Sequence, residues 1–596
     1  MPKGSLPYSR LVEAYDALEA TTKRLELTDI LVELYRETPV EDVVRVTYLN
    51  QGKLYPDYLG VEVGLGDRMV VRAISAATGL QVGRIESLYR EKGDLGTAAE
   101  EASSGRVQST LFPAPLTVSD VYSELDSLAH LSGSGSQDAK LRSLASLLNR
   151  ATPREVRYLV RMTLGQLRLG VADFTILDAL ALAYTGDRGN RPALERAYNI
   201  SSDLGAVAKA VAQGGLRGLG GFGVVVGRPI RPMLAERLSS AEEIVAEMGG
   251  KCAAEFKYDG ERMQIHKSKG RVTLFSRRLE VITQHYPDAV KLAAEKVRAK
   301  EAILECEGVA VDPDSGELLP FQELMHRRRK YGIEEMMARF PVSLFFFDVM
   351  YADGVSYLDA PYQQRRKELE AIVERSDRTT VAPALVTDKP AEIEAFMEEA
   401  IQEGCEGLVV KDLSSPYKAG ARAFGWIKLK REYRSELSDT LDLVVVGAFY
   451  GRGRRAGTYG AYLLAAYDKA DDSFETVCKV GTGFSDADLE AIPKKLKPLI
   501  MQHVHPRVVS KMEADVWFVP QLVFEVIASE ITLSPIHVAA LGKVRPGAGL
   551  ALRFPKFTGK VRDDKSPEDA TTTAELLEMY NSQLKKISAK EKEGAQ

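Results

Sequence analysis

Cysteine is scarce in this chain of 596 residues. The four cysteines are Cys252, Cys306, Cys405 and Cys478, and they lie far apart. No two of them form a C-x-x-C pair, which excludes a cysteine zinc ribbon and a thioredoxin-like redox motif. Cysteines this sparse also argue against a disulfide framework and indicate a reducing compartment.

Long apolar runs are also missing. No stretch approaches the ~18 apolar residues that a transmembrane helix needs, so we expect no membrane association. The first ten residues, MPKGSLPYSR, contain no hydrophobic segment, and we expect no cleaved secretion signal. With 45% apolar and 27% charged residues, the composition excludes a disordered or collagen-like chain. At ~150 residues per domain, the length predicts about four domains, or three large ones.

Neither sign of charge dominates the chain as a whole. There are 79 lysines and arginines against 84 acidic residues, a net charge of −5. Basic residues are nevertheless concentrated in the stretches 326–330, 411–434, 451–455 and 540–562. A polyanion site needs local positive potential rather than a basic total, so these stretches are candidate contacts. For any one of them, an ordinary solvated surface is the alternative interpretation.

The first 220 residues predict an all-helical domain. The segment Thr152–Glu155 (TPRE) has the pattern of a helix capping box, and apolar residues at helical spacing follow it. The stretch 173–184 is similarly rich in apolar residues. Loops rich in glycine and serine, such as 132–137, are expected between the helices.

Beyond a glycine cluster at 214–223 the pattern changes. Short strands and helices alternate over 221–432, which predicts a mixed α/β domain. The segment 433–585 is mostly strands with a helix expected over 486–501, which suits a small β-barrel. The charged tail 586–596 is expected to be frayed. Within the middle domain, the pattern predicts a hairpin around 268–270, helices over 287–300 and 390–403, and a buried strand over 344–351.

The segment EFKYDGER at 255–262 carries the strongest chemical signal. Lys257 ends an expected strand and enters a turn made by Asp259 and Gly260, so its amine can project into a pocket. A lysine amine must lose its proton before it can act as a nucleophile, and partial burial favours that loss. By composition alone, K-x-D-G occurs by chance in roughly one protein in ten of this length. The segment therefore gains meaning only from its companions.

Suitable companions follow in order along the chain. Glu305, Glu307 and Glu406 are carboxylates at expected strand ends, where they can hold Mg²⁺ against a phosphate. Strand alternation puts Lys428 and Lys430 on one face, where two ammonium groups can meet one phosphate.

An aromatic residue, Phe347, lies in the expected buried strand. Without its context it would be an ordinary core aromatic, but beside a nucleotide pocket it is a candidate platform for base stacking.

The motifs KYDGER, FSRR, ECEGVA, FFFDVMY, EGLVVK and WIKLK, in this order, resemble those of ATP-dependent DNA ligases, especially the archaeal replicative type, which is similar to eukaryotic DNA ligase I. The resemblance covers nearly the whole chain. GSGSQ at 133–137 and LRLG at 167–170 match the family's DNA-binding domain. RFPKF at 553–557 and VRDDK at 561–565 match its last motif.

This resemblance implies a multidomain fold with an all-α DNA-binding domain, an α/β nucleotidyltransferase (adenylation) domain and a β-barrel OB-fold domain. It also implies an enzyme that seals nicks in duplex DNA through a covalent lysyl-AMP, in DNA replication, repair and recombination.

Individual roles follow from the same resemblance. Lys257 would carry the adenylyl group, Glu255 would read the adenine amino group and Phe347 would stack on adenine. Arg262 and Arg277 would contact ribose and the phosphate of the nick. The other implied contacts are Glu307 and Glu406 for nucleotide and metal, Arg422, Lys428 and Lys430 for phosphates, Arg553, Lys556 and Arg562 for pyrophosphate release, and Gly133, Gly135, Ser136, Arg168 and Gly170 for DNA.

The implied cofactors are ATP and Mg²⁺, with Mn²⁺ as an alternative metal, and the implied partner is nicked duplex DNA. We expect a monomer in the cytoplasm, associated with the nucleoid. The sequence ECEG departs from the E-G-E pattern frequent in archaeal relatives, and we expect only altered packing around Glu307. The residues leave the nucleotide range open among ATP, ADP, dATP and GTP.

Other interpretations explain less of the chain. An mRNA capping guanylyltransferase also uses a K-x-D-G lysine, but neither it nor an RNA ligase needs a helical region of this length. An NAD-dependent ligase would bring a cysteine zinc module, which the cysteine spacing excludes. A non-catalytic DNA-binding scaffold would have lost Lys257, Glu307, Glu406 or Lys428, and all four are present.

A separate signal lies in the expected loop 103–118, SSGRVQSTLFPAPLTV. Its Gln108, Leu111 and Phe112 resemble the short clamp-binding motif of archaeal ligases, although the longer eukaryotic motif has two aromatics. An apolar pair on a polar loop can anchor a partner protein in a pocket. We therefore predict that this loop binds the sliding clamp PCNA. The alternative is that Phe112 packs into the helical core.

Overall fold

The structure is a computed structural model, and it describes most of the chain. The described residues are 4–105, 114–311, 318–319, 321–327, 332–403, 405–430, 440–451, 458–528, 530–534, 536–553 and 555–582. Their contacts divide the chain into two compact units. One comprises Met1–Ile85 and Ala99–Arg431, and the other comprises Glu86–Ala98 and Glu432–Gln596.

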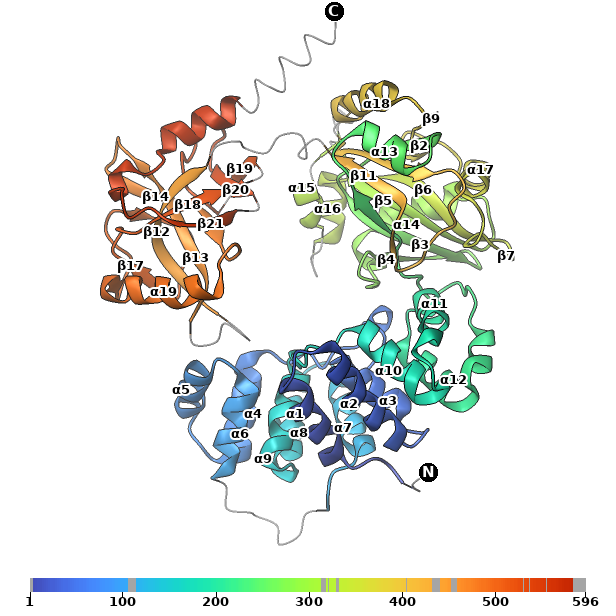
Figure 1. The fold of residues 1–596 in the computed structure, drawn as a ribbon, viewed down its shortest axis with the longest axis horizontal. Coiled ribbons are helices and arrows are strands. Elements are labelled where there is room, and N and C mark those ends of the chain that lie inside the picture. The colour runs from blue at the N-terminus through green and yellow to red at the C-terminus, as the bar shows by residue number, and fades with distance from the viewer. Residues whose placement is uncertain are drawn as a thin grey trace, which may run out of the picture. The chain divides into compact units, whose positions relative to one another are not determined.

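The N-terminal region is helical (Figure 1). Its helices are α1 (Tyr8–Glu19), α2 (Arg24–Glu37), α3 (Val43–Asn50), α4 (Asp67–Thr78), α5 (Val82–Lys92), α6 (Leu95–Ser104), α7 (Val118–His130), α8 (Ser136–Arg150), α9 (Pro153–Thr163), α10 (Asp173–Thr185), α11 (Arg191–Ser201) and α12 (Leu204–Gly214). Short 3₁₀ turns accompany them: η1 (Asp57–Leu59), η2 (Arg188–Asn190) and η3 (Gly215–Gly221).

Local sequence explains where these helices begin. The predicted capping box is confirmed, because Thr152 and Glu155 each accept a hydrogen bond from the backbone N–H of the other. The predicted loop 132–137 is wrong at its end, since Ser136 already begins α8. Gly135 precedes it with φ of 77°, a left-handed conformation that only glycine adopts without strain.

Two sheets form the middle of the chain. The five-stranded sheet has the order β1-β11-β10-β2-β9, and the six-stranded sheet has the order β4-β3-β5-β6-β7 with β8 paired to β6. The strands of the first are β1 (Leu234–Arg237), β2 (Cys252–Lys257), β9 (Ala384–Thr387), β10 (Gly407–Asp412) and β11 (Arg422–Lys430). Those of the second are β3 (Glu261–Ser268), β4 (Arg271–Ser276), β5 (Ala302–Ala310), β6 (Val342–Ala352), β7 (Val355–Ser356) and β8 (Thr379–Val381).

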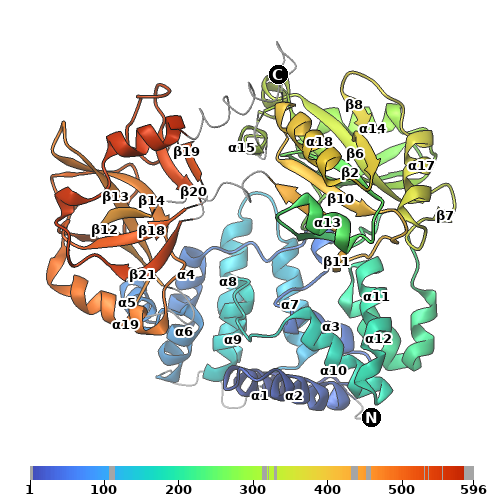
Figure 2. The same cartoon turned by 45° about the horizontal axis from the view of Figure 1, so that its top comes forward.

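Helices cover each sheet and bury its apolar side chains. α18 (Pro390–Gln402) contacts β2 and β10 and also α13 (Ala241–Glu247), as Figure 2 shows. α14 (Pro287–Lys296) and α17 (Tyr362–Ile372) contact the six-stranded sheet. The remaining helical segments of this region are η4 (Thr283–His285), α15 (Phe321–Met325) and α16 (Ile333–Arg339).

Most elements that the sequence predicts here are present. The hairpin turns at Lys269 and Gly270, both with positive φ, between β3 and β4. The buried strand over 344–351 lies within β6. The helix predicted over 287–300 ends early, at Lys296, because Val297 leaves the helix and forms a β-bridge with Val373.

The second unit is rich in strands. Its larger sheet runs β15-β17-β12-β13-β14-β16, with β18 pairing β12 and β21, and β19 pairs only with β20 among the described strands. Bounds are β12 (Leu441–Tyr450), β13 (Tyr459–Asp468), β14 (Ser473–Val480), β15 (Ile500–Met501), β16 (Val508–Val509), β17 (Val516–Phe518), β18 (Val523–Ile527), β19 (Glu530–Ser534), β20 (Gly549–Arg553) and β21 (Lys556–Val561).

The helix predicted over 486–501 is shorter in the structure. It is α19 (Asp486–Leu496), followed by the 3₁₀ turn η7 (Lys497–Leu499) and then by β15. Pro498 lacks a backbone N–H, so it cannot extend the hydrogen-bond ladder of the helix. The chain then passes a 3₁₀ turn, η8 (Pro567–Asp569), and is helical again over 573–582.

None of the helices in the described part of the chain is both long and apolar enough to cross a membrane.

Candidate functional site

A cavity of about 390 Å³ is bounded by both sheets of the first unit. Every residue for which the family resemblance implied a nucleotide or metal contact lines this cavity. These residues are Glu255, Lys257, Arg262, Arg277, Glu307, Phe347, Glu406, Arg422, Lys428 and Lys430. The tertiary structure thus brings together side chains from distant motifs, which the sequence could only order along the chain.

Lys257 is the last residue of β2, as predicted, and its side chain is 26% exposed. Its carbonyl accepts a hydrogen bond of 2.8 Å from the N–H of Glu406, the residue before β10. Its Nζ lies 2.6 Å from Glu406 Oε2, and Lys430 Nζ lies 2.8 Å from the same oxygen. Two ammonium groups therefore share one carboxylate.

The turn after Lys257 is tightly packed. A side chain at Gly260 would come within 2.4 Å of the carbonyl oxygen of Gly308, so only glycine fits at this position. Asp259 accepts a hydrogen bond of 3.3 Å from the N–H of Phe321. Burial and the nearby carboxylate of Glu406 raise the pKa of Asp259.

Two carboxylates of the cavity differ in their electrostatics. Burial tends to raise the pKa of Glu406, but the ammonium groups of Lys257 and Lys430 outweigh it and lower the pKa to about 2. Burial raises the pKa of Glu307 to about 7, although Lys257 and Arg262 oppose the shift. At neutral pH, Glu406 is therefore charged, while Glu307 is close to its titration midpoint.

The predicted strand-end position of Glu305 and Glu307 is wrong. Both lie inside β5, two residues apart, so strand alternation alone would place them on the same face. Glu307 lines the cavity, whereas Glu305 is 1% exposed and does not line it. Glu305 instead forms a two-point ion pair with Arg262, with distances of 3.1 Å and 2.7 Å.

Cations gather along β11. Lys428 and Lys430 both line the cavity, as their alternation predicts, and Arg422 lines it at the start of the same strand. Burial, and then the neighbouring charges of Lys430 and Arg422, lower the pKa of Lys428. Such a concentration of positive charge suits a phosphate-bearing ligand.

Part of the cavity lining is aromatic. Phe347 is partly buried, and its ring meets that of Trp426 edge to face at 6.0 Å. The guanidinium carbon of Arg262 lies 5.4 Å from the centre of the Phe347 ring. Glu255 lies near this wall and is 1% exposed.

Sequence reasoning missed three residues that contact Glu255. Tyr362 and Arg366 come from α17, and Lys411 comes from β10. Lys411 could have been singled out, because it ends the EGLVVK motif and is only 1% exposed. Nothing near α17 in the sequence signals a role for Tyr362 or Arg366.

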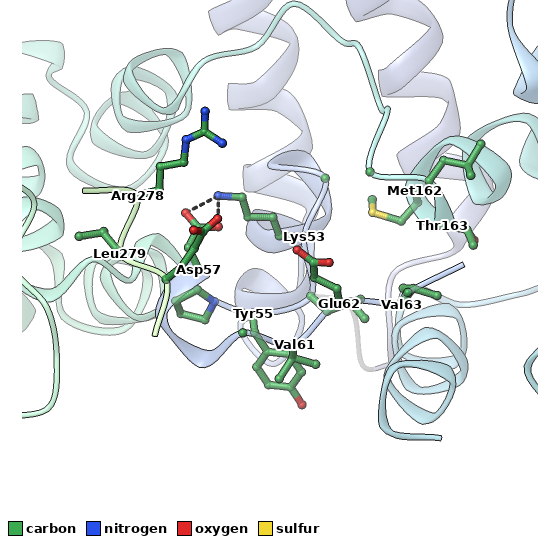
Figure 3. Close-up of a pocket in the computed structure, with 18 of the residues that line it drawn as sticks. Lys53, Tyr55, Asp57, Val61, Glu62, Val63, Met162, Thr163, Arg278 and Leu279 are labelled. Carbon is green, nitrogen blue, oxygen red and sulfur yellow. Dashed lines mark hydrogen bonds and ion pairs between the residues drawn. The ribbon is translucent and has the colours of Figure 1, made fainter. Parts of the chain in front are cut away.

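A second cavity, of about 940 Å³, lies beside the first. Its lining includes the loop 52–66 of the helical region and the turn 277–280 after β4. Figure 3 shows Lys53 paired with Asp57 in this lining, at 2.6 Å, and Arg278 contributed by the turn. Arg277 lines both cavities.

The remaining predicted contacts lie elsewhere. Gly133 and Gly135 both precede α8, which Ser136 begins, and Arg168 and Gly170 both have positive φ. In the second unit, Arg553 ends β20 and Lys556 begins β21. Arg562 pairs with Asp564 at 2.7 Å and with Asp442 at 2.9 Å. Gln108, Leu111 and Phe112 lie outside the described residues.

The strand-end lysine, the charged Glu406 and the cationic strand around a cavity between two sheets suit a nucleotidyltransferase. Three family models together match most of the chain: "DNA ligase N terminus" over 7–181, "ATP dependent DNA ligase domain" over 232–430, and "ATP dependent DNA ligase C terminal region" over 455–565. The chain belongs to the ATP-dependent DNA ligases, and its similar relatives are archaeal.

Individual relatives match over nearly their whole length. A DNA ligase of Cenarchaeum symbiosum is 51% identical over 98% of this chain and 99% of its own. DNA ligase 2 of Thermofilum pendens is 52% identical over 98% of each chain. The solved structure "Pmar-Lig_PreS3" is 18% identical, with a TM-score of 0.55 over 92% of this chain and 98% of its own, and this likeness concerns the fold alone.

Proposed function

We propose that this ligase acts through Lys257, which attacks the α-phosphate of ATP and forms a lysyl-AMP as pyrophosphate leaves. The AMP then passes to the 5′-phosphate of a nick, and the 3′-hydroxyl displaces it to close the strand. The observation that carries this proposal is that Lys257 shares one cavity with every residue implied for the nucleotide.

The chain's own charges suit this sequence of steps. Each step concentrates negative charge on a phosphoryl group, which fixed cations stabilise. Arg422, Lys428 and Lys430 are assigned to the phosphates, because they lie on one strand of the cavity. Phe347 is assigned to the base, because it belongs to the aromatic part of the lining.

The residues also fit a magnesium ion. In the described part of the chain, no three His, Cys, Asp or Glu side chains form a metal cluster. Mg²⁺ is commonly held by only one or two carboxylates together with phosphates and water, and Glu307 and Glu406 would provide these carboxylates. When bound, the ion would neutralise charge on the phosphate oxygens, and Mn²⁺ could replace it.

Nicked DNA is assigned to the first unit beside the nucleotide. Arg277 lines both cavities, so one guanidinium can reach the phosphate of the nucleotide and that of the nick. The start of α8, with the two glycines before it, and the segment from Arg168 to Gly170 are proposed as phosphate contacts of the helical region.

We propose domain limits of 1–220, 221–432 and 433–585, with a tail at 586–596. The longer segment of the second unit begins at Glu432, which supports the limit between the second and third domains. The C-terminal strands are proposed to form an OB-fold, in which Arg553, Lys556 and Arg562 assist the release of pyrophosphate. The protein is proposed to act as a monomer and to dock on PCNA through Gln108, Leu111 and Phe112.

Incubation with α-labelled ATP or GTP tests the central proposal. ATP should leave an acid-stable label on the protein, and peptide mapping should locate it at Lys257. Unlabelled nicked duplex should discharge the label, whereas intact duplex should not. A label on another residue, or one that nicked DNA does not remove, contradicts the proposal.

A further inference from the structure

Glu255 is a buried carboxylate that lines the nucleotide cavity, and three donors hold it. The hydroxyl of Tyr362 donates to Oε1 at 2.5 Å, and Nη1 of Arg366 donates to the same oxygen at 3.1 Å. Nζ of Lys411 lies 2.7 Å from Oε2. Both carboxylate oxygens are therefore engaged before any ligand arrives.

Tyr362 and Arg366 approach Glu255 from outside the cavity. They lie one helical turn apart on α17, so both face the same way, and neither lines the cavity. Tyr362 is 2% exposed and the Arg366 side chain is 13% exposed. Lys411, which does line the cavity, also donates to the carbonyl of Phe347 at 2.7 Å.

The bonds to Glu255 determine what it can offer a ligand. An ionised carboxylate only accepts hydrogen bonds, and the three groups that contact Glu255 are all donors. Tyr362 and Arg366 together occupy Oε1, whereas Oε2 has a single partner among the described contacts. The acceptor that remains for a ligand is therefore on Oε2.

A fixed acceptor distinguishes purines at position 6. An amino group at position 6 donates a hydrogen bond to the carboxylate. An oxo group is itself an acceptor, so it would face the carboxylate without forming a hydrogen bond. A rotated or protonated carboxyl group would lose this distinction, because a protonated carboxyl also donates.

We propose that Tyr362 and Arg366 are positioning residues that, together with Lys411, fix Glu255 as a hydrogen-bond acceptor and so set the preference of the adenylylation step for a 6-amino over a 6-oxo purine. This inference rests on the proposed function, in which Glu255 faces the base.

The test compares self-nucleotidylation of the full-length protein by ATP and by ITP, its 6-oxo counterpart. Tyr362→Phe removes one hydroxyl and keeps the ring, and Arg366→Met removes the charge. In the double variant, KM for ATP should rise roughly tenfold, as loss of hydrogen bonds to a charged group implies. The maximal rate with ATP and all constants for ITP should change less than about twofold.

Matched variants separate positioning from general stability. Arg366→Lys keeps a cation near Glu255 and should retain most of the preference for ATP. Lys367→Gln changes an exposed residue of the same helix and should change neither nucleotide's constants. Equal losses with ATP and ITP in the double variant, or an unchanged preference, would overturn the inference. If the double variant does not fold, Tyr362→Phe alone decides, with the same outcomes on a smaller scale.

Glu255→Gln distinguishes failure of the inference from failure of the proposed role of Glu255. A glutamine both donates and accepts, so the preference for ATP should collapse if Glu255 faces the base. If this variant keeps the full preference, Glu255 does not read the base, and the inference fails with it. If the preference collapses here but survives in Tyr362→Phe/Arg366→Met, only the inference about the positioning residues fails.

Discussion

Lys257 Nζ lies 2.6 Å from Glu406 Oε2, where the end of β2 lies beside the start of β10. The Glu406 N–H also donates to the Lys257 carbonyl, so the backbone fixes the two residues relative to each other. Lys430 binds the same oxygen, which means that Glu406 has a second cation to balance its charge when the Lys257 amine loses its proton. Glu406 therefore holds the Lys257 side chain in place, and Lys430 is a second partner of the same carboxylate.

Lys257→Ala should abolish self-adenylylation, because no other side chain supplies the nucleophile. It should leave measurable sealing of a nick that is already adenylylated, since the last step needs no lysine nucleophile. Gel labelling with ATP and sealing of a pre-adenylylated duplex measure the two effects. Lys251→Ala, at an exposed lysine just before β2, is the matched control. Normal labelling of the Lys257 variant would refute the assignment.

The raised pKa of Glu307 predicts a pH dependence. Its pKa of about 7 in the folded protein lies above the ordinary 4.5, so the folded state retains a proton that the unfolded chain releases. The free energy of unfolding should therefore fall as pH rises from about 4.5 to about 7. Glu307→Gln should flatten this fall in urea denaturation. An equal pH dependence of the free energy of unfolding in the wild type and in Glu307→Gln would contradict this prediction.

The same group should shape the activity profile. If ionised Glu307 is required, kcat/KM for adenylylation in the wild type should rise through about pH 7. Glu406 should add no limb in this range, because its pKa is about 2. Glu307→Gln should be slower and should lack the limb near pH 7.

Lys428→Ala should slow the chemical steps far more than it weakens DNA binding. One lost electrostatic partner at a reacting centre costs roughly 2.7–4 kcal/mol, or about a hundredfold to a thousandfold in rate. Single-turnover sealing and nick affinity should be measured on the same preparation. Lys418→Ala, which changes a lysine outside the cavity lining, is the comparison. A loss confined to DNA affinity would exclude the proposed role.

Affinity for nicked duplex should fall steeply with salt. Contacts to about six or more phosphates imply a loss of orders of magnitude between about 50 and 200 mM salt. Arg168→Ala should reduce the slope of log affinity against log salt by about one, without affecting self-adenylylation. A slope unchanged by the substitution would remove Arg168 from the DNA contacts.

Phe112→Ala should weaken binding to PCNA and leave nick sealing without the clamp intact. Titration calorimetry gives the affinity, and thermal unfolding shows whether the variant is folded. Unchanged affinity, or a variant that simply unfolds, would favour the alternative in which Phe112 packs into the helical core.

Local patterns predicted the fold's elements well and their ends less well. The capping box at Thr152, the hairpin at Gly270 and the strand around Phe347 depend on neighbouring residues, and all are present. The helix predicted to reach residue 300 ends at Lys296, because Val297 pairs with a residue of a distant segment. Helix ends depend on such partners, which no local pattern contains.

The sequence by itself determined the order of the motifs, the lysine at a strand end and the shared face of Lys428 and Lys430, because strand geometry alternates with a fixed period. Only the tertiary structure decided which carboxylates face the cavity. Glu305 and Glu307 lie on one strand, yet only Glu307 lines the cavity, while Glu305 pairs with Arg262. The partners of Glu255 were equally hidden, since Tyr362 lies 107 residues away along the chain. Contacts between residues so far apart in the sequence form only when helix and sheet pack together. A buried carboxylate needs donors or cations around it, and packing alone supplies them.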